Sequence, residues 1–173
     1  GSISWDLMVE RYNADLANVL GNLVSRTIAM TNKYFGGVVE RPEASFSPED
    51  AALDADLEKT VLDGVKKIRE KMDVLRVADA MTELWNIFKR CNKYIDETLP
   101  WALAKDESKQ DRLKAVLYHL TEALTIGASL LFSFMPETSE KILKELGTEK
   151  RELEAMDTFG LYPSGTRVAA EAE

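Results

Sequence analysis

The chain has 173 residues, of which 45% are hydrophobic and 30% charged, a mixture typical of one folded globular domain and not of a disordered segment. Its 22 basic and 30 acidic side chains give a net charge of −8, which excludes a general phosphate-backbone binder of the histone kind. A single cysteine, Cys91, and a single histidine, His119, exclude an internal disulfide framework and a His-rich metal site.

Apolar side chains recur with helical spacing along most of the chain. The first of these apolar stripes predicts a helix over about residues 4–34. Gly36 and Gly37 end this helix, because paired glycines do not sustain a helix. Gly21 lies inside this helix, where glycine costs about 1 kcal/mol relative to alanine. We therefore expect Gly21 to mark close packing by a neighbouring helix.

The later helices are predicted from caps and prolines as well as from apolar spacing. Ser47 is the expected N-cap of a second helix that begins at Pro48. A third helix is expected over about residues 77–99, and Pro100 either ends it or starts a tight turn just after it. The remaining helices are expected over about residues 113–134 and from Pro136 to Leu146.

These elements predict an all-α fold, an antiparallel helical bundle of about five helices. No segment alternates for long enough to predict a strand, and no apolar run approaches the roughly 20 residues that cross a bilayer. Residues 1–2 are interpreted as a cloning remnant, residues 3–158 as the bundle and residues 159–173 as an irregular C-terminal tail.

The search for catalytic motifs yields no candidate. The sequence has no phosphate-binding glycine loop, and no serine stands in a nucleophile-elbow pattern. Cys91 falls on the apolar stripe of the third helix and His119 beside that of the fourth, so both are expected at the core. Trp5 and Trp85 are expected to be structural. An enzyme or metalloprotein is the least favoured interpretation, with no catalytic or metal-binding residue predicted.

Two places depart from a plain bundle. On the first helix, Asn22 and Arg26 are one turn apart in a polar stripe beside the apolar one, so both side chains can reach the same object. Asparagine offers a donor and an acceptor, and arginine a flat fork of donors. After the third helix, Pro100 fixes the chain next to Trp101, whose indole can stack on an unpaired base if it is exposed. Composition alone favours an indole folded back over the bundle end.

The same two regions are locally basic. Residues 11–35 carry three basic side chains and one acidic one, and residues 85–114 carry seven basic and five acidic ones, so each window has a net charge of +2. The rest of the chain then carries −12, because −8 − 4 = −12. The sequence therefore predicts a local face that tolerates anions on an acidic body.

Three segments in this order resemble the anticodon-binding domain of methionyl-tRNA synthetase. They read RYNADLANVLGNLVSRTIAMTNKYFGG at 11–37, NKYIDETLPWALAKD at 92–106 and LLFSFMPETSEKILKELG at 130–147. The resemblance implies the helical bundle of class I synthetases.

Within it, Asn22 and Arg26 match the residues that contact the CAU anticodon, and Trp101 matches the one that stacks on the first anticodon base, with Pro100 shaping the turn. Lys33 and Lys105 are expected to contact backbone phosphates.

The resemblance also implies what the parent protein does. The family attaches methionine to its tRNA using ATP, in a catalytic domain N-terminal to the bundle that carries the motifs HIGH and KMSKS, and neither motif occurs here. This segment is therefore expected to be inactive alone and to need no cofactor, with ATP and magnesium bound by the parent. The expected partners are the anticodon loop of methionine tRNA and the parent's catalytic domain. No binding to membranes or DNA is expected, and the expected location is the cytoplasm. Many members of the family continue past the bundle into a short segment that returns to the catalytic domain, and some carry a further dimerising domain. Both are expected to be absent here.

Two functional hypotheses follow. In the first, the chain reads a single-stranded anticodon by stacking and by hydrogen bonds to base edges. In the second, it is a non-catalytic helical protein-interaction module with Trp101 as anchor. The first requires Asn22, Arg26 and Trp101 to face one open pocket, whereas the second tolerates Asn22 facing solvent.

Overall fold

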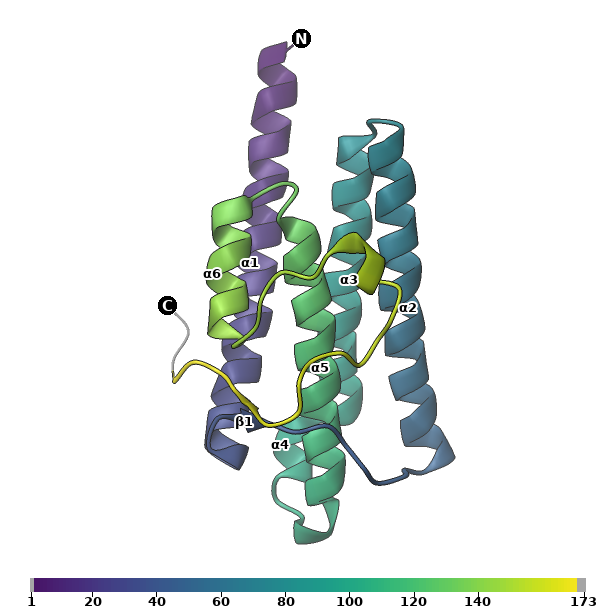
Figure 1. Cartoon of the computed structure of the whole chain (residues 1–173), viewed down its shortest axis with the longest axis vertical. Helices are drawn as coiled ribbons and strands as arrows, with labels where there is room; N and C mark the ends of the chain where they lie inside the picture. Colours follow the sequence, from purple (N-terminus) through teal and green to yellow (C-terminus); the bar gives the residue numbers. More distant parts are fainter. Residues whose placement is uncertain (1, 171–173) are drawn as a thin grey trace.

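The computed structural model describes the backbone of residues 2–170 and the side chains of residues 7–170. Trp5, predicted to be structural, lies outside the described side chains. Within the described part the fold is helical, and the predicted all-α bundle is confirmed (Figure 1). Its long helices are α1 (Ser2–Phe35), α2 (Pro48–Asp73), α3 (Val77–Thr98), α5 (Gln110–Leu131) and α6 (Pro136–Glu145).

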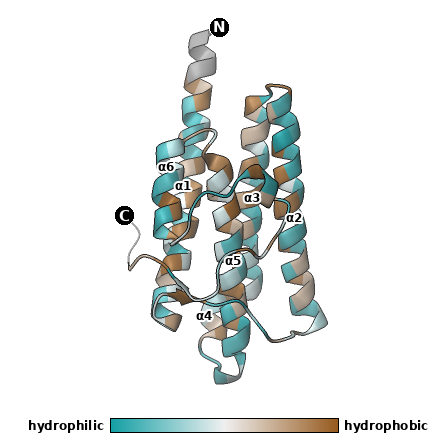
Figure 2. Ribbon diagram, in the orientation of Figure 1, coloured by the Kyte–Doolittle hydropathy of each residue, from teal (hydrophilic) through white to brown (hydrophobic). Residues whose placement is uncertain are grey.

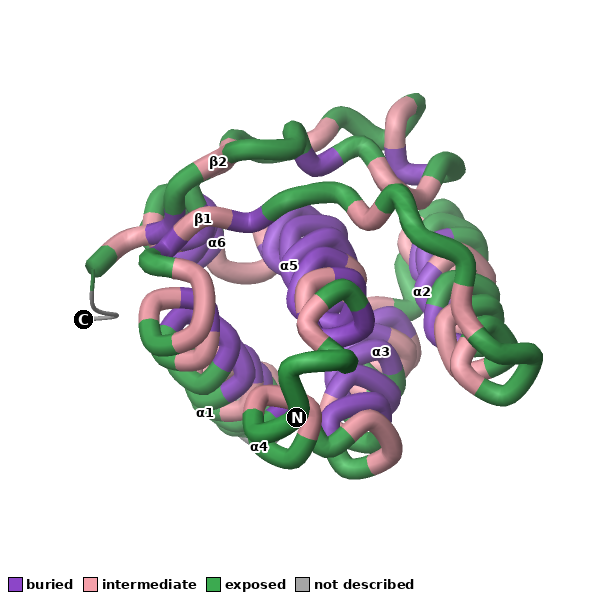
Figure 3. Tube along the Cα trace, turned by 90° about the horizontal axis from the view of Figure 1, so that it is seen from below, coloured by how far each residue is buried: buried purple, intermediate pink, exposed green. Residues whose placement is uncertain are grey.

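Helix α5 is the centre of the bundle. It contacts α1, α2, α3 and α6, and almost all of its side chains are buried (Figure 3). The surrounding helices are amphipathic, and Figure 2 shows apolar and polar residues interleaved along each of them. Helices α1 and α3 run in the same direction beside one another, which matters for the site described below (Figure 1). None of the helices described is both long and apolar enough to pass through a membrane.

The ends of the helices follow their local sequence. The Ser47 hydroxyl accepts a hydrogen bond of 3.2 Å from the backbone N–H of Asp50, and Pro48 is the first residue of α2, as predicted. Helix α3 ends where Leu99 adopts a left-handed backbone with φ of 48°. Pro100 then begins a short helix, α4 (Pro100–Leu103), which periodicity did not predict because it has a single turn.

The expectation for Gly21 was wrong. A Cβ atom on Gly21 would meet nothing within 4 Å, so no helix packs closely there. The close approaches occur at Gly64 in α2 and Gly127 in α5, where a Cβ atom would lie 2.7 Å from Ile87 and Phe88 side chains respectively. Gly127 lets the Phe88 ring of α3 press against the backbone of α5.

A small antiparallel sheet accompanies the bundle, and its strands are too short for alternation to predict them. Strand β1 (Val38–Val39) pairs with β2 (Thr166–Arg167), with Val39 opposite Thr166. Residues 148–170, which we call the C-terminal strap, cross the outer side of α5 towards α2 and return to β1 (Figure 1). The strap includes the short 3-10 helix η2 (Leu153–Ala155), and a second, η1 (Glu107–Lys109), precedes α5.

One buried carboxylate holds the strap against α5. The Glu122 side chain is fully buried and accepts hydrogen bonds from the Arg151 guanidinium, with 2.8 Å to Nη1. It also accepts from the backbone N–H groups of Gly160, Leu161 and Tyr162, at 2.8 Å for Leu161 and 3.1 Å for Tyr162. A buried charge is tolerated when it is paired and hydrogen-bonded in this way.

Candidate functional site

Asn22 and Arg26 lie exposed on the face of α1 that is turned towards α3. Together with Val19 and Ser25 of α1 they line a hollow of about 450 Å³ between the two helices. Helix α3 contributes Asn92 to the same hollow. The structure therefore brings the predicted Asn22–Arg26 pair to one concave surface and adds an asparagine from the facing helix.

Three of the polar side chains around this hollow are available to a ligand. In the described part of the chain, Asn22, Arg26 and Asn92 take part in no hydrogen bond or ion pair. Two carboxamides and a guanidinium supply donors and acceptors in fixed planes, the kind of groups that read the edge of a base. Sequence reasoning missed Asn92, although it opens the second segment on which the resemblance rests.

Pro100 and Trp101 lie beyond this hollow, at the end of the bundle at which α1 and α3 finish (Figure 1). Pro100 is buried and begins α4, whereas Trp101 keeps 42% of its surface exposed. Leu99, in its left-handed conformation, is exposed beside them. Trp101 does not line the hollow of Asn22 and Arg26, so the three residues do not face one open pocket, and this requirement of the anticodon-reading hypothesis is not met. The indole is an open surface nine residues after Asn92, beyond the end of α3.

The two predicted phosphate contacts are exposed cations near these features. Lys33 lies on α1 seven residues after Arg26, with its ammonium 5.7 Å from the centre of the Tyr34 ring. Lys105 follows α4, four residues after Trp101. No ion pair occupies either side chain among the residues that the structure describes. Both are therefore free to meet phosphate in solution.

Cys91 is a core residue, as predicted. Its side chain is fully buried, and burial raises the pKa of the thiol to about 12 despite the opposing charge of Arg90. A thiol in this state is not a nucleophile near neutral pH. Trp85 is half-buried and packs against the core, and no cluster of three or more metal-binding side chains occurs within residues 7–170.

His119 belongs to a polar cluster that the sequence did not predict. Its Nδ1 lies 3.3 Å from the Tyr94 hydroxyl and 3.5 Å from Asp54 Oδ1. Asp54 also accepts hydrogen bonds from Tyr94 at 2.5 Å and from the Arg112 guanidinium at 2.7 Å and 3.0 Å. Burial acts to raise the pKa of Asp54, but the hydrogen bonds from His119, Arg112 and Tyr94 outweigh it and hold that pKa well below its usual value. The cluster joins α2, α3 and α5, which is a structural role.

The sequence and fold were compared with known proteins. The family model of the anticodon binding domain of methionyl tRNA ligase matches residues 42–170, which include Asn92 and Trp101 and begin after Asn22 and Arg26. The methionine–tRNA ligase of Caldanaerobacter subterraneus subsp. tengcongensis is 46% identical over 97% of this chain and 26% of its own length. That of Bacillus subtilis is 44% identical over 89% of this chain and 23% of its own length.

Solved structures agree with the sequence comparison. The free-state crystal structure of Mycobacterium tuberculosis methionyl-tRNA synthetase matches 95% of this chain and 33% of that protein, with a TM-score of 0.78 and 33% identity. The methionyl-adenylate complex of that synthetase matches with a TM-score of 0.77 and 34% identity. This chain spans about a quarter of the length of the curated relatives. Because the family model covers most of the chain, the chain belongs to the methionyl-tRNA ligase anticodon-binding domains.

Proposed function

We propose that this chain reads the CAU anticodon of methionine tRNA. The observation that carries the proposal is the hollow between α1 and α3, around which Asn22, Arg26 and Asn92 present hydrogen-bonding groups without partners in the described structure. A base that enters this hollow meets donors and acceptors at its edge. A wrong base leaves one of these groups unpaired, at a cost of about 1–3 kcal/mol.

Trp101 adds affinity in this proposal. An exposed indole stacks on an unpaired base and contributes about 1–3 kcal/mol, largely whatever the base is. Pro100 is buried and holds the backbone next to the indole, so the ring is presented at a fixed place. Lys33 and Lys105 contact phosphates on either side of the bound bases. In this proposal, the Trp101 indole and the hollow therefore bind different nucleotides of one loop.

The parent activity is part of the proposal. We infer that the chain serves a methionine–tRNA ligase, whose catalytic domain binds ATP and magnesium and attaches methionine to the tRNA in the cytoplasm. This chain alone is expected to be inactive in aminoacylation. The protein-interaction alternative has less support, because the curated relatives that cover nearly all of this chain are methionine–tRNA ligases.

A binding titration at low salt tests the proposal. Two RNA hairpins differ only in the second base of the anticodon, CAU or CGU, and keep the first base, which the resemblance assigns to Trp101. We expect CAU to bind more tightly, Arg26→Ala and Asn22→Ala to remove the preference, and Trp101→Ala to weaken both hairpins about five-fold or more. Arg69→Ala, which removes an exposed arginine of α2 that does not line the hollow, is the matched control for Arg26→Ala. Equal binding of both hairpins, unchanged by these substitutions, contradicts the proposal and favours a protein partner.

A further inference from the structure

A second hollow, of about 220 Å³, lies in the same groove between α1 and α3. Its walls are Tyr12, Asp15 and Leu16 from α1 and Met81, Thr82 and Trp85 from α3. Asp15 precedes Asn22 by seven residues, and Trp85 precedes Asn92 by seven residues. Because α1 and α3 run in the same direction, these equal spacings place the two hollows about 10 Å apart along one groove.

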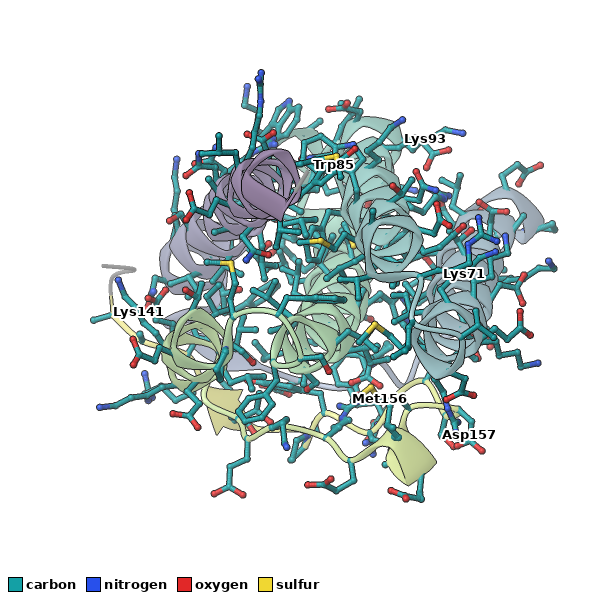
Figure 4. All side chains as sticks on the ribbon, turned by 90° about the horizontal axis from the view of Figure 1, so that it is seen from above. Lys71, Trp85, Lys93, Lys141, Met156 and Asp157 are labelled. Atoms are coloured by element: carbon teal, nitrogen blue, oxygen red, sulfur yellow. The ribbon has the colours of Figure 1, made fainter. Side chains whose placement is uncertain are left out.

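The walls of the second hollow suit a flat aromatic ring. Trp85 packs against the core and is therefore held in place, and Figure 4 shows it between α1 and α3 on the outer side of the bundle. Tyr12 is 38% exposed on the opposite wall. Neither the Tyr12 hydroxyl nor the Trp85 indole N–H has a hydrogen-bond partner in residues 7–170. Two aromatic side chains on opposite walls can hold a base by stacking.

One edge of the second hollow is polar. The Asp15 carboxylate is exposed and, among the described residues, takes part in no ion pair or hydrogen bond. A carboxylate accepts a hydrogen bond from the exocyclic amine of adenine, cytosine or guanine. It repels the carbonyl edge of uracil. Asp15 thus selects an amino-bearing base among those that can stack there.

A cation lies between the two hollows. Lys89 is exposed on α3, one turn after Trp85 and three residues before Asn92, and has no ion-pair partner in the described part of the chain. Its ammonium can meet the phosphate of a strand that passes from one hollow to the other. Along α1 and α3, the groove thus contains one hollow, then a cation, and then the other hollow.

We propose that the hollow of Tyr12 and Trp85 binds one unpaired adenine, cytosine or guanine of the same hairpin loop, outside the anticodon triplet, with Lys89 on the intervening phosphate. This inference rests on the proposed function, because it places a second nucleotide of the RNA that the first hollow reads. The continuity of the groove and the two aromatic walls support a base over an apolar protein segment, which would leave Lys89 and Asp15 without a role.

The test is a double-mutant cycle between protein and RNA. CAU hairpins with one abasic nucleotide at each loop position outside the triplet are titrated against the unaltered chain, Tyr12→Ala and Trp85→Leu. We expect one position at which the abasic nucleotide weakens binding of the unaltered chain about five-fold or more but adds no further loss in the two variants. Uracil at that position weakens binding of the unaltered chain and not of Asp15→Ala.

Two controls separate the possible failures. Leu153→Ala removes an exposed apolar side chain from the C-terminal strap and is expected to leave all affinities unchanged. Tyr12 is a surface residue, so its variant keeps the test valid if Trp85→Leu fails to fold. If the CAU preference persists but no position outside the triplet couples to Tyr12 or Trp85, this inference is wrong and the proposed function stands. If the unaltered chain shows no CAU preference, the proposed function fails first and this inference with it.

Discussion

Asp54 joins three helices through one carboxylate, and its protonation state is linked to the stability of the fold. Its folded-state pKa lies well below the ordinary value of 3.8, because His119, Arg112 and Tyr94 donate to the ionised form. A lowered pKa in the folded state stabilises the protein above the unfolded-state pKa, and this stability is lost as the pH falls. The loss therefore begins near pH 4 and continues at lower pH.

We expect Asp54→Asn to lower the free energy of unfolding at pH 7 by about 3 kcal/mol, because buried Arg112 is left with only the more distant Asp50 carboxylate, at 3.7 Å, as counter-charge. The variant should also lose less stability than the unaltered chain between pH 5 and pH 3. Urea unfolding at each pH measures both effects. Asp63→Asn is the control, since Asp63 is an exposed partner of Lys59. Parallel pH profiles for the Asp54 variant and the unaltered chain would contradict the assignment.

At the scale of helices, two glycines that both lie inside a helix have opposite roles in packing. Gly21 has open space where a Cβ atom would stand, whereas Gly127 has the Phe88 ring 2.7 Å from that position. Gly21→Ala should raise the free energy of unfolding by about 1 kcal/mol through helix propensity. Gly127→Ala should lower it by about 1–3 kcal/mol, because the buried ring has to move. Thermal and urea unfolding of the pair measure the difference, and shifts of the same sign would contradict it.

The same contrast shows what local sequence can predict. Periodicity and caps specify where a helix begins and which face is apolar, so Ser47 and the stripe of α1 were predicted correctly. They do not specify which glycine meets a neighbour, because that depends on how two helices cross. Asn92 was missed for the same reason, since it joins Asn22 only once α3 lies beside α1. Strands of two residues, such as β1, are too short to show any period.

Across the whole molecule, the acidic composition does not prevent exposed cations from lying on the proposed RNA face. The net charge is −8, yet Arg26, Lys33, Lys89 and Lys105 are exposed cations without ion-pair partners among the described residues, all on α1, α3 or the segment after α4. Other basic side chains differ among themselves: Arg90 is paired with Asp56 and Glu97, whereas Lys66 and Lys67 of α2 are exposed and have no ion-pair partner among the described residues. The proposed RNA face therefore has a few free cations, enough to position a short loop and too few to hold long duplexes.

The C-terminal strap closes the opposite part of the molecule through Glu122. Its carboxylate is fully buried and has Arg151 and three backbone N–H groups of the strap as donors. Glu122→Gln replaces an acceptor oxygen by an amide that faces donors, and it leaves Arg151 without its counter-charge. We expect the strap to detach while the helices remain, because apart from η2 and the two-residue β2 the strap has no helix or strand of its own.

Limited trypsin digestion measures this detachment, since Lys150, Arg151 and Arg167 lie in the strap. Glu122→Gln should be cleaved there several-fold faster than the unaltered chain, with helical circular dichroism retained. Glu152→Gln, which changes an exposed carboxylate in the same strap, is the matched control and should be cleaved at the normal rate. Since the α1–α3 groove contains no strap residue, the Glu122 variant should keep its CAU preference. Unchanged cleavage would show that the strap is held by β1 and its apolar contacts alone.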